Sequence, residues 1–328
     1  MKRALLFLTA ILIAASPAFA GGSDDALSLV PPDAASVGVI RLDELRNSPL
    51  GARIFEDTDR LAGDGEAGRF FEETGLDPKR DVDVVVVAAS PAAAGAAESA
   101  LVLFEGRFDP PRLQAAIASR GGKLKRTPQG DYMLLDADHA QRSPGAIAFA
   151  SRRLAIAGTE AAVGRALAQR STGGSGFLSG QGIGRYYSRI EGDSSAWALV
   201  DAVRYPLARR SHGGSGEASG DPAAALAGAM KSVSLFAFQV RSHADSLSVS
   251  ATGLTADSET RGLLEDALRG VVAMWRLAIH EKSPDMVSVL RKFEIDSDRE
   301  GVTIRGTLPG SFIRSLTERA QRRHRSAK

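Results

Sequence analysis

A run of apolar residues at positions 81–90 is the clearest structural signal in the chain. It reads Asp-Val-Asp-Val-Val-Val-Val-Ala-Ala-Ser, and Pro91 follows it directly. β-Branched side chains crowd a helix but pack well on a pleated sheet, and the run is short. The pattern therefore predicts a buried strand. A second apolar run at 99–108 predicts its antiparallel partner, joined to it through a loose Ala-, Gly- and Pro-rich loop.

The same order of apolar runs occurs again in the second half of the chain. Residues 233–240 and 246–253 predict another strand hairpin. A single strand is predicted ahead of each hairpin, at 37–42 in the first half and at 196–200 in the second.

Short motifs recur in the same order as the strands. Segments 43–53 and 201–209 both read Asp, any residue, a hydrophobic residue and Arg, followed by Pro-Leu. Residues 156–159 (Ile-Ala-Gly-Thr) resemble 304–307 (Ile-Arg-Gly-Thr), and a helical pattern follows each of them. Together these recurrences predict an internal duplication.

Helices are predicted where apolar residues at helical spacing follow a capping residue. Asp109, Thr159 and Asp257 stand in this position. Ser48 followed by Pro49 predicts another helix start, and residues 66–74 predict a short helix that Gly75 ends.

Alternating hairpins and single helices predict an α+β fold of two duplicated units, with helices packed on one face of antiparallel sheets. The pattern leaves open whether the two sheets lie side by side or merge. The predicted division of the chain is a signal peptide (1–20), a flexible lead-in (21–35), a first unit (36–170), a Gly- and Ser-rich linker (171–194), a second unit (195–320) with a disordered insert (211–221), and a basic tail (321–328).

Residues 1–20 have the three parts of an export signal. Lys2 and Arg3 precede an uncharged apolar stretch, and Ala18-Phe19-Ala20 has the small residues of a cleavage site. The apolar stretch is shorter than the ~20 residues of a transmembrane helix, which favours a cleaved signal over an uncleaved anchor. We therefore expect an exported protein, periplasmic or extracellular, that has no membrane span after cleavage.

Composition removes several kinds of chemistry from consideration. The chain contains no cysteine, which excludes disulfides, thiol nucleophiles and Cys-ligated metals. Its 41 basic residues nearly balance its 39 acidic ones, so the overall charge gives no reason to expect nucleic acid as a partner. We expect no cofactor.

Three segments resemble a family of secreted bacterial proteins of unknown function. They are 30–35 (Val-Pro-Pro-Asp-Ala-Ala), 42–51, and 74–83, which begins Thr-Gly-Leu-Asp-Pro. The resemblance covers mainly the first half of the chain. It implies a location in the bacterial envelope, and it implies no established activity and no functional residues.

Candidate catalytic or metal-binding groups are few. Asp81 and Asp83 share one face of the predicted strand, but the entrance of a strand is also where charged residues usually mark the solvent side. Asp136, Asp138 and His139 form a sparse acidic group on a predicted hairpin edge, where a solvated edge is favoured over a metal site. We predict no catalytic residues and no metal site.

Arg185, Tyr186 and Tyr187 are the predicted binding residues. Adjacent tyrosines point in different directions, so one of them is a candidate for an exposed contact; the alternative is that both pack against the second unit. The glycines at 180, 182 and 184 superficially resemble a phosphate loop but follow no strand, so a flexible hinge is favoured. Trp197 and Trp275 are expected in the core.

The sequence therefore favours an exported, non-enzymatic envelope protein that binds another envelope protein or polymer, through a groove between the two units. One alternative is a secreted hydrolase whose catalytic groups come from distant segments. Another is surface adhesion through residues 314–328, which are rich in Arg. The oligomeric state stays open.

Overall fold

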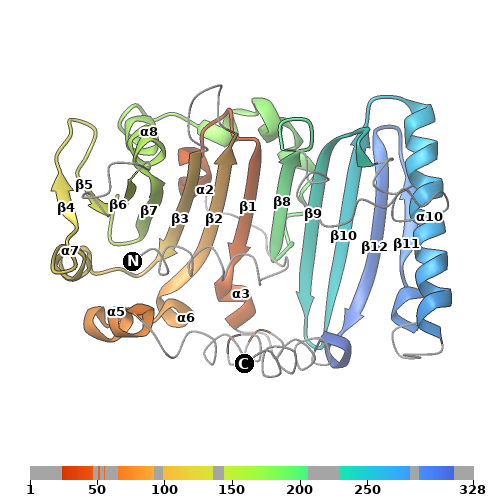
Figure 1. Ribbon diagram of the computed structural model, residues 1–328, viewed down its shortest axis with the longest axis horizontal. Coiled ribbons are helices and arrows are strands. Elements are labelled where there is room, and N and C mark those ends of the chain that lie inside the picture. The colour runs from red at the N-terminus through yellow and green to blue at the C-terminus, as the bar shows by residue number, and fades with distance from the viewer. Residues whose placement is uncertain are drawn as a thin grey trace, which may run out of the picture.

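The computed structural model describes residues 24–46, 51, 55, 66–91, 99–135, 144–205, 230–280 and 288–313. Within these residues twelve strands form one antiparallel sheet, in the order β11-β12-β10-β9-β8-β1-β2-β3-β7-β6-β5-β4 (Figure 1). The strands are β1 (Ser36–Arg41), β2 (Val82–Ser90), β3 (Ser99–Gly106), β4 (Lys123–Lys125), β5 (Tyr132–Leu135), β6 (Gly145–Phe149), β7 (Leu154–Thr159), β8 (Ala196–Asp201), β9 (Val233–His243), β10 (Ser246–Thr255), β11 (Glu294–Ser297) and β12 (Gly301–Pro309). With its helices, the chain has the predicted α+β fold.

Strands β1 and β8 join the two halves of the sheet. They pair antiparallel from Ser36 opposite Val200 to Ile40 opposite Ala196. On one side of this pair the order is β2, β3, β7, β6, and on the other side it is β9, β10, β12, β11. The two halves therefore merge into one continuous sheet, and the boundary between them is a ladder of hydrogen bonds rather than a groove.

The helices lie between and beside these strands. They are α2 (Asp24–Leu29), α3 (Leu42–Arg46), α5 (Glu66–Thr74), α6 (Pro78–Asp81), α7 (Pro110–Ala118), α8 (Glu160–Ser171), the 3-10 helices η1 (Gly176–Ser179) and η2 (Gly182–Arg189), and α10 (Ser258–His280). The predicted caps at Asp109 and Thr159 accept hydrogen bonds from the backbone N–H groups of Arg112 and Ala162, respectively. None of the described helices is both long enough and apolar enough to cross a membrane.

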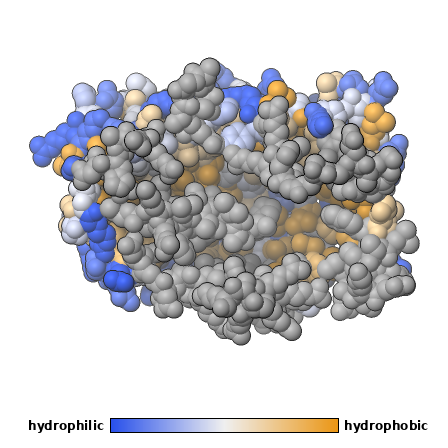
Figure 2. Space-filling model, viewed as in Figure 1, coloured by the Kyte–Doolittle hydropathy of each residue, from blue (hydrophilic) through white to orange (hydrophobic). Residues whose placement is uncertain are grey.

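The sheet has two faces. Side chains alternate between the faces along a strand, so Val39 and Val86 lie on one face, and Ile40 and Val85 on the other. We call these the Val39 face and the Val85 face. Figure 2 shows hydrophobic side chains along the middle of the sheet and mainly hydrophilic ones at the end where β4 lies.

The main core lies on the Val39 face of the first half. Buried side chains of α2, α8, η1 and η2, such as Leu27, Val163 and Phe177, pack there against Val86 and Leu103 of the sheet. A second set of contacts lies on the opposite face of the second half, where Leu264 of α10 packs with Phe236 and Val302. The two halves are therefore covered by helices on opposite faces.

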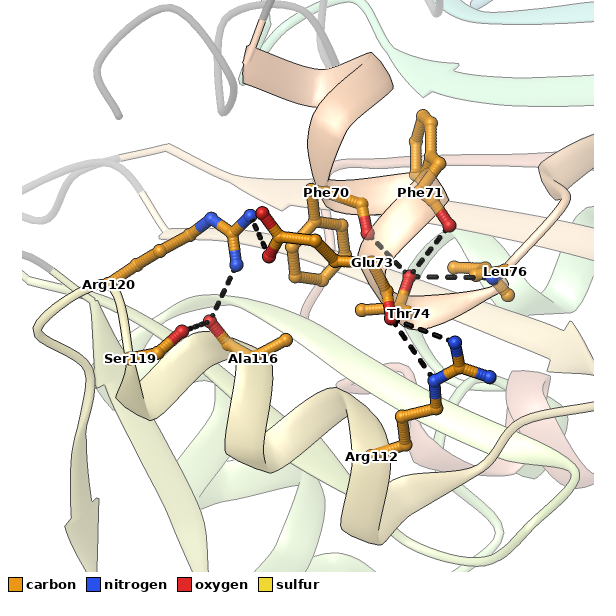
Figure 3. A network of polar contacts seen from close by, with 9 residues as sticks. All are labelled: Phe70, Phe71, Glu73, Thr74, Leu76, Arg112, Ala116, Ser119 and Arg120. Atoms are coloured by element: carbon orange, nitrogen blue, oxygen red, sulfur yellow. Dashed lines mark hydrogen bonds and ion pairs between the residues drawn. The ribbon is translucent and has the colours of Figure 1, made fainter.

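Helices α5 and α7 are fastened to each other by an arginine network (Figure 3). Arg112 donates two hydrogen bonds to the backbone oxygen of Glu73, at 3.2 and 2.9 Å. Arg120 forms an ion pair with the Glu73 carboxylate, and its guanidinium lies 5.2 Å from the centre of the Phe70 ring. Gly75 follows with a φ of 67°, the left-handed conformation expected of a residue that ends a helix. Because the network satisfies its own polar groups, we assign it a structural role.

A second polar contact attaches the outer strands to α8. The Glu160 carboxylate accepts hydrogen bonds from Lys125 at 2.5 Å and from the Tyr132 hydroxyl at 2.9 Å. These bonds, first that of Lys125 and then that of Tyr132, hold the pKa of Glu160 below its usual value.

We expect this contact to make stability depend on pH in the acid range. A carboxyl whose folded pKa is lowered contributes stability above its unfolded pKa of about 4.3, and this contribution disappears as pH falls through the folded pKa. Glu160→Gln should therefore lower the free energy of unfolding at about pH 7, and the difference from the wild type should be smaller at about pH 3. Urea unfolding at both pH values measures this. An equal difference at both would contradict the assignment.

Two segments that were expected to be flexible are packed instead. Residues 24–35 fall within the predicted lead-in, yet Leu27 and Val30 are fully buried, because α2 turns its apolar side onto the core. In the predicted linker 171–194, Phe177 and Ile183 are buried, and the backbone N–H of Phe177 donates to the oxygen of Val30 at 2.9 Å. A few apolar side chains in a Gly- and Ser-rich stretch are enough to anchor it.

Several expectations lie outside the described residues. They are the signal peptide 1–20, the helix start at Ser48, the carboxylate group with His139, the insert 211–221, the tail 321–328 and the side chain of Trp275.

Candidate binding surface

The predicted binding residues lie on η2 and do not form one site. The Tyr187 ring packs into the core, 5.5 Å from Phe177 and 5.4 Å from Trp197 between ring centres. Burial raises the pKa of its hydroxyl. Arg185 is exposed, and its guanidinium lies 4.8 Å from the ring centre of Tyr186. Because Trp197 belongs to β8, Tyr187 packs against the second half of the chain, as the alternative interpretation proposed.

Asp81 and Asp83 have separate partners. An oxygen of Asp83 accepts a hydrogen bond from Arg46 at 3.0 Å. Asp81 accepts one from the backbone N–H of Asp77 at 2.8 Å and lies 3.9 Å from Arg107. The carboxylates therefore stabilise the start of β2. The part of the chain that the structure describes contains no group of three or more His, Asp or Glu side chains suited to holding a metal.

Gly180 and Gly182 connect η1 to η2, with φ values of 73° and 54°. Their left-handed conformations turn the chain between two helices that pack on the core. The turn lies between two 3-10 helices rather than between a strand and a helix, which is not the setting of a phosphate loop.

The Val39 face changes character abruptly along the sheet. One row of paired residues crosses it from β6 to β11. It reads Ala148, Ile156, Leu103, Val86, Val39, Trp197, Gln239, Ser250, Arg305 and Glu294. The next row on the same face also becomes polar toward β11. In it, Ala237 of β9 is followed by Thr252, Thr303 and Asp296. The face is therefore apolar as far as β8. Beyond β8 its apolar residues Leu235, Ala237 and Leu254 lie at one end of β9 and β10, and the rest of the face is polar.

We call the polar part the hydroxyl face. It consists of Gln239 and Arg241 of β9, Ser248, Ser250 and Thr252 of β10, and Thr303, Arg305 and Thr307 of β12. Thr252 is buried, six of the others are half-buried, and the Arg305 side chain is 55% exposed. Helix α10, which packs on these strands, covers their other face.

Polar contacts hold the side chains of the hydroxyl face in place. The hydroxyls of Thr252 and Thr303 lie 2.8 Å apart, and Arg305 forms an ion pair with Asp296 at 3.3 Å. The loop after η2 borders the face, because the Gln239 amide donates to the backbone oxygen of Arg189 at 3.2 Å and Arg241 lies 3.2 Å from Asp193. Arg189 itself forms ion pairs with Asp298 and Glu300 in the β11–β12 turn. The predicted Arg185 and Tyr186 lie on this bordering helix.

The geometry suits recognition of a polar, extended ligand. Rows of hydroxyls repeat at about 4.8 Å between strands and about 6.7 Å along each strand. Serine and threonine hydroxyls both donate and accept hydrogen bonds, as do the hydroxyls of sugars. The alternation Ser-Leu-Ser-Val-Ser-Ala-Thr at 246–252 was visible in the sequence, and it was the signal for this face that the sequence analysis missed.

One pair at the border has the geometry of a nucleophile and a base. The Oγ of Ser248 lies 2.9 Å from the Nε2 of His243, near the β9–β10 turn. Among the described residues, the other ring nitrogen of His243 has no partner to orient it. The third member of a catalytic triad is therefore missing from this pair as described.

Comparison with known proteins gives a likeness of fold. No family model matches the chain, and no curated protein matches it. It is similar to TP0453 in crystal form III, with a TM-score of 0.52 and 8% sequence identity over 89% of this chain and 97% of that one. Crystal forms IV and I of TP0453 give TM-scores of 0.49 and 0.46, at 9% identity each, over 90% and 89% of this chain and 99% and 96% of that one. At this level of identity, the chain resembles TP0453 in its α+β fold.

Proposed function

We propose that the chain is an exported, non-enzymatic protein of the bacterial envelope that binds an envelope glycan on its hydroxyl face. The observation that carries the proposal is the change along the Val39 face, from a core that helices cover to an ordered polar surface. The location is supported by the sequence pattern of an export signal and by the resemblance to secreted bacterial proteins.

The proposal gives the predicted duplication a functional meaning. Both halves follow the same strand order outward from the β1–β8 pair, which supports a common origin. On this view one copy kept an apolar Val39 face and filled it with α2, α8 and Phe177. The other copy acquired serines and threonines at the corresponding positions and left them for a ligand.

A glycan fits the hydroxyl face better than an apolar partner does. Apolar surfaces bind by excluding water, and this face offers hydroxyls, an amide and guanidinium groups instead. A flat array of this kind makes many weak hydrogen bonds, direct or through water, along an extended chain.

The test is co-sedimentation of the chain from residue 21 onward with purified peptidoglycan sacculi. The binding variant combines Ser250→Ala, Thr303→Val and Arg305→Met. Each lost hydrogen bond is worth about 0.5–1.5 kcal/mol, so we expect the three together to lower affinity roughly 10- to 1,000-fold. The control combines Arg152→Met and Arg153→Met in the β6–β7 turn, which are exposed and distant from the hydroxyl face in the strand order.

Wild-type binding that the triple variant loses and the control keeps supports the proposal. If only the control variant loses binding, attachment would be assigned to the β6–β7 turn instead. Absence of wild-type binding to sacculi would overturn the glycan assignment.

The Ser248–His243 contact favours one second candidate, the hydrolase. If it is correct, the wild type hydrolyses a short-chain p-nitrophenyl ester, and Ser248→Ala and His243→Ala each remove this activity. No hydrolysis above background would end the hydrolase hypothesis for this pair.

A further inference from the structure

A second candidate site lies between α10 and β11, apart from the hydroxyl face. A pocket of about 210 Å³ is lined there by Arg269, Val272 and Arg276 of the helix and by Phe293 and Ile295. Ile295 pairs with Ile304 on the side of the sheet that α10 covers. The pocket therefore opens on the Val85 side, whereas the hydroxyl face is on the other side.

The polar groups of the pocket are both guanidinium groups. Arg276 is fixed by two hydrogen bonds from its Nε and Nη2 to the backbone oxygen of Leu290, at 3.2 and 2.7 Å. Arg269 forms an ion pair with Glu265 at 2.5 Å through one nitrogen, and its side chain is 58% exposed. An arginine has five N–H donors, so both keep donors that these contacts do not use.

The charges leave the pocket positive. Among the described residues, two guanidinium groups line the pocket and only that of Arg269 is paired with a carboxylate, that of Glu265, so the set carries one net positive charge. Val272, Phe293 and Ile295 form the apolar part of the pocket wall. A planar guanidinium matches a carboxylate in shape and charge, while the apolar residues favour a hydrocarbon body.

We infer that this pocket binds a small organic monocarboxylate with an apolar body. The volume equals that of roughly seven water molecules at about 30 Å³ each, which suits a ligand of about seven to ten non-hydrogen atoms. The carboxylate lies between Arg269 and Arg276, and the body lies against Phe293 and Ile295. This inference does not depend on the proposed glycan binding.

Phenylacetate, which has about ten non-hydrogen atoms, is the probe, and phenylacetamide is its neutral counterpart. We expect NMR titration to give a Kd on the order of 1 mM for phenylacetate, within the ligand efficiency of so small a molecule. The amide, which lacks the charge, should bind at least about tenfold more weakly. Arg276 is not substituted, because it holds the backbone of Leu290.

Three variants locate the binding. Arg269→Met should weaken phenylacetate binding by about five- to tenfold, and Val272→Trp, which fills the pocket, should abolish it. Lys292→Met removes a neighbouring exposed charge that does not line the pocket, and should leave the Kd unchanged. Circular dichroism checks the fold of each variant.

The inference is overturned if the amide binds as tightly as the acid, or if a folded Val272→Trp variant keeps wild-type affinity. It is also overturned if phenylacetate produces no chemical-shift change up to about 10 mM, ten times the expected Kd. If Val272→Trp does not fold, the acid–amide comparison and Arg269→Met decide.

Discussion

Val39→Asp is expected to leave no folded protein at ambient temperature. Val39 is 1% exposed and sits in β1 between Val86 of β2 and Trp197 of β8, at the place where the two halves join. An aspartate there would bury a carboxylate among apolar side chains without a described partner. Such a change costs more than about 5 kcal/mol, which is comparable to the whole stability of many domains. Circular dichroism and urea unfolding measure the effect.

The matched control for Val39→Asp lies in the same row of the sheet. Ser250 is on the same face, three strands away from Val39, between Gln239 and Arg305. We expect Ser250→Asp to fold and to change the free energy of unfolding by no more than about 1 kcal/mol, because this part of the face is open to water. If both variants lowered the free energy of unfolding by similar amounts, this would contradict the change from buried apolar to solvated polar residues along the row.

Phe177→Ala is expected to lower the free energy of unfolding by about 3–5 kcal/mol. Phe177 is 1% exposed and stacks 5.9 Å from the ring of Trp197, so the truncation leaves a cavity against the central strands. Urea unfolding monitored by tryptophan fluorescence measures the loss and also reports on the neighbouring indole. Val203→Ala is the control, because Val203 is 76% exposed and its truncation should cost no more than about 0.5 kcal/mol.

This experiment also decides the nature of segment 171–194. If it were the flexible linker that its composition indicates, Phe177→Ala and Val203→Ala would have equally small effects. A large effect for Phe177 alone places the segment in the folded core.

The sequence predicted local structure well where a pattern determines it. Four consecutive valines at 84–87 specify a strand, and Asp109 and Thr159 cap helices as expected. The pairing of β1 with β8 could not be predicted from the sequence. This pairing joins residues about 160 positions apart and depends on which edge strands the two halves present to each other. The packing of α2 was missed for a similar reason. Six residues are too few to show a helical period, and their burial depends on what α8 and η1 supply.

The candidate surface was predicted only in part. Adjacent aromatic and charged residues directed attention to Arg185, Tyr186 and Tyr187, and the structure places them on the helix that leads to the border of the hydroxyl face. The hydroxyl face itself combines alternate residues of β9, β10 and β12, and these strands become neighbours only on folding. Alternating serines are also common on ordinary solvated strands, so the alternation gains meaning only beside the apolar row that it continues.

The central ladder has a consequence for how the chain responds to proteases. β1 comes from the first half and β8 from the second, and five residue pairs from Ser36–Val200 to Ile40–Ala196 join them directly. Trp197 of the second half is also enclosed by Phe177 and Tyr187. A single cut between η2 and β8 would therefore cleave the polypeptide, but the two fragments would stay associated. Denaturant would be needed to dissociate them.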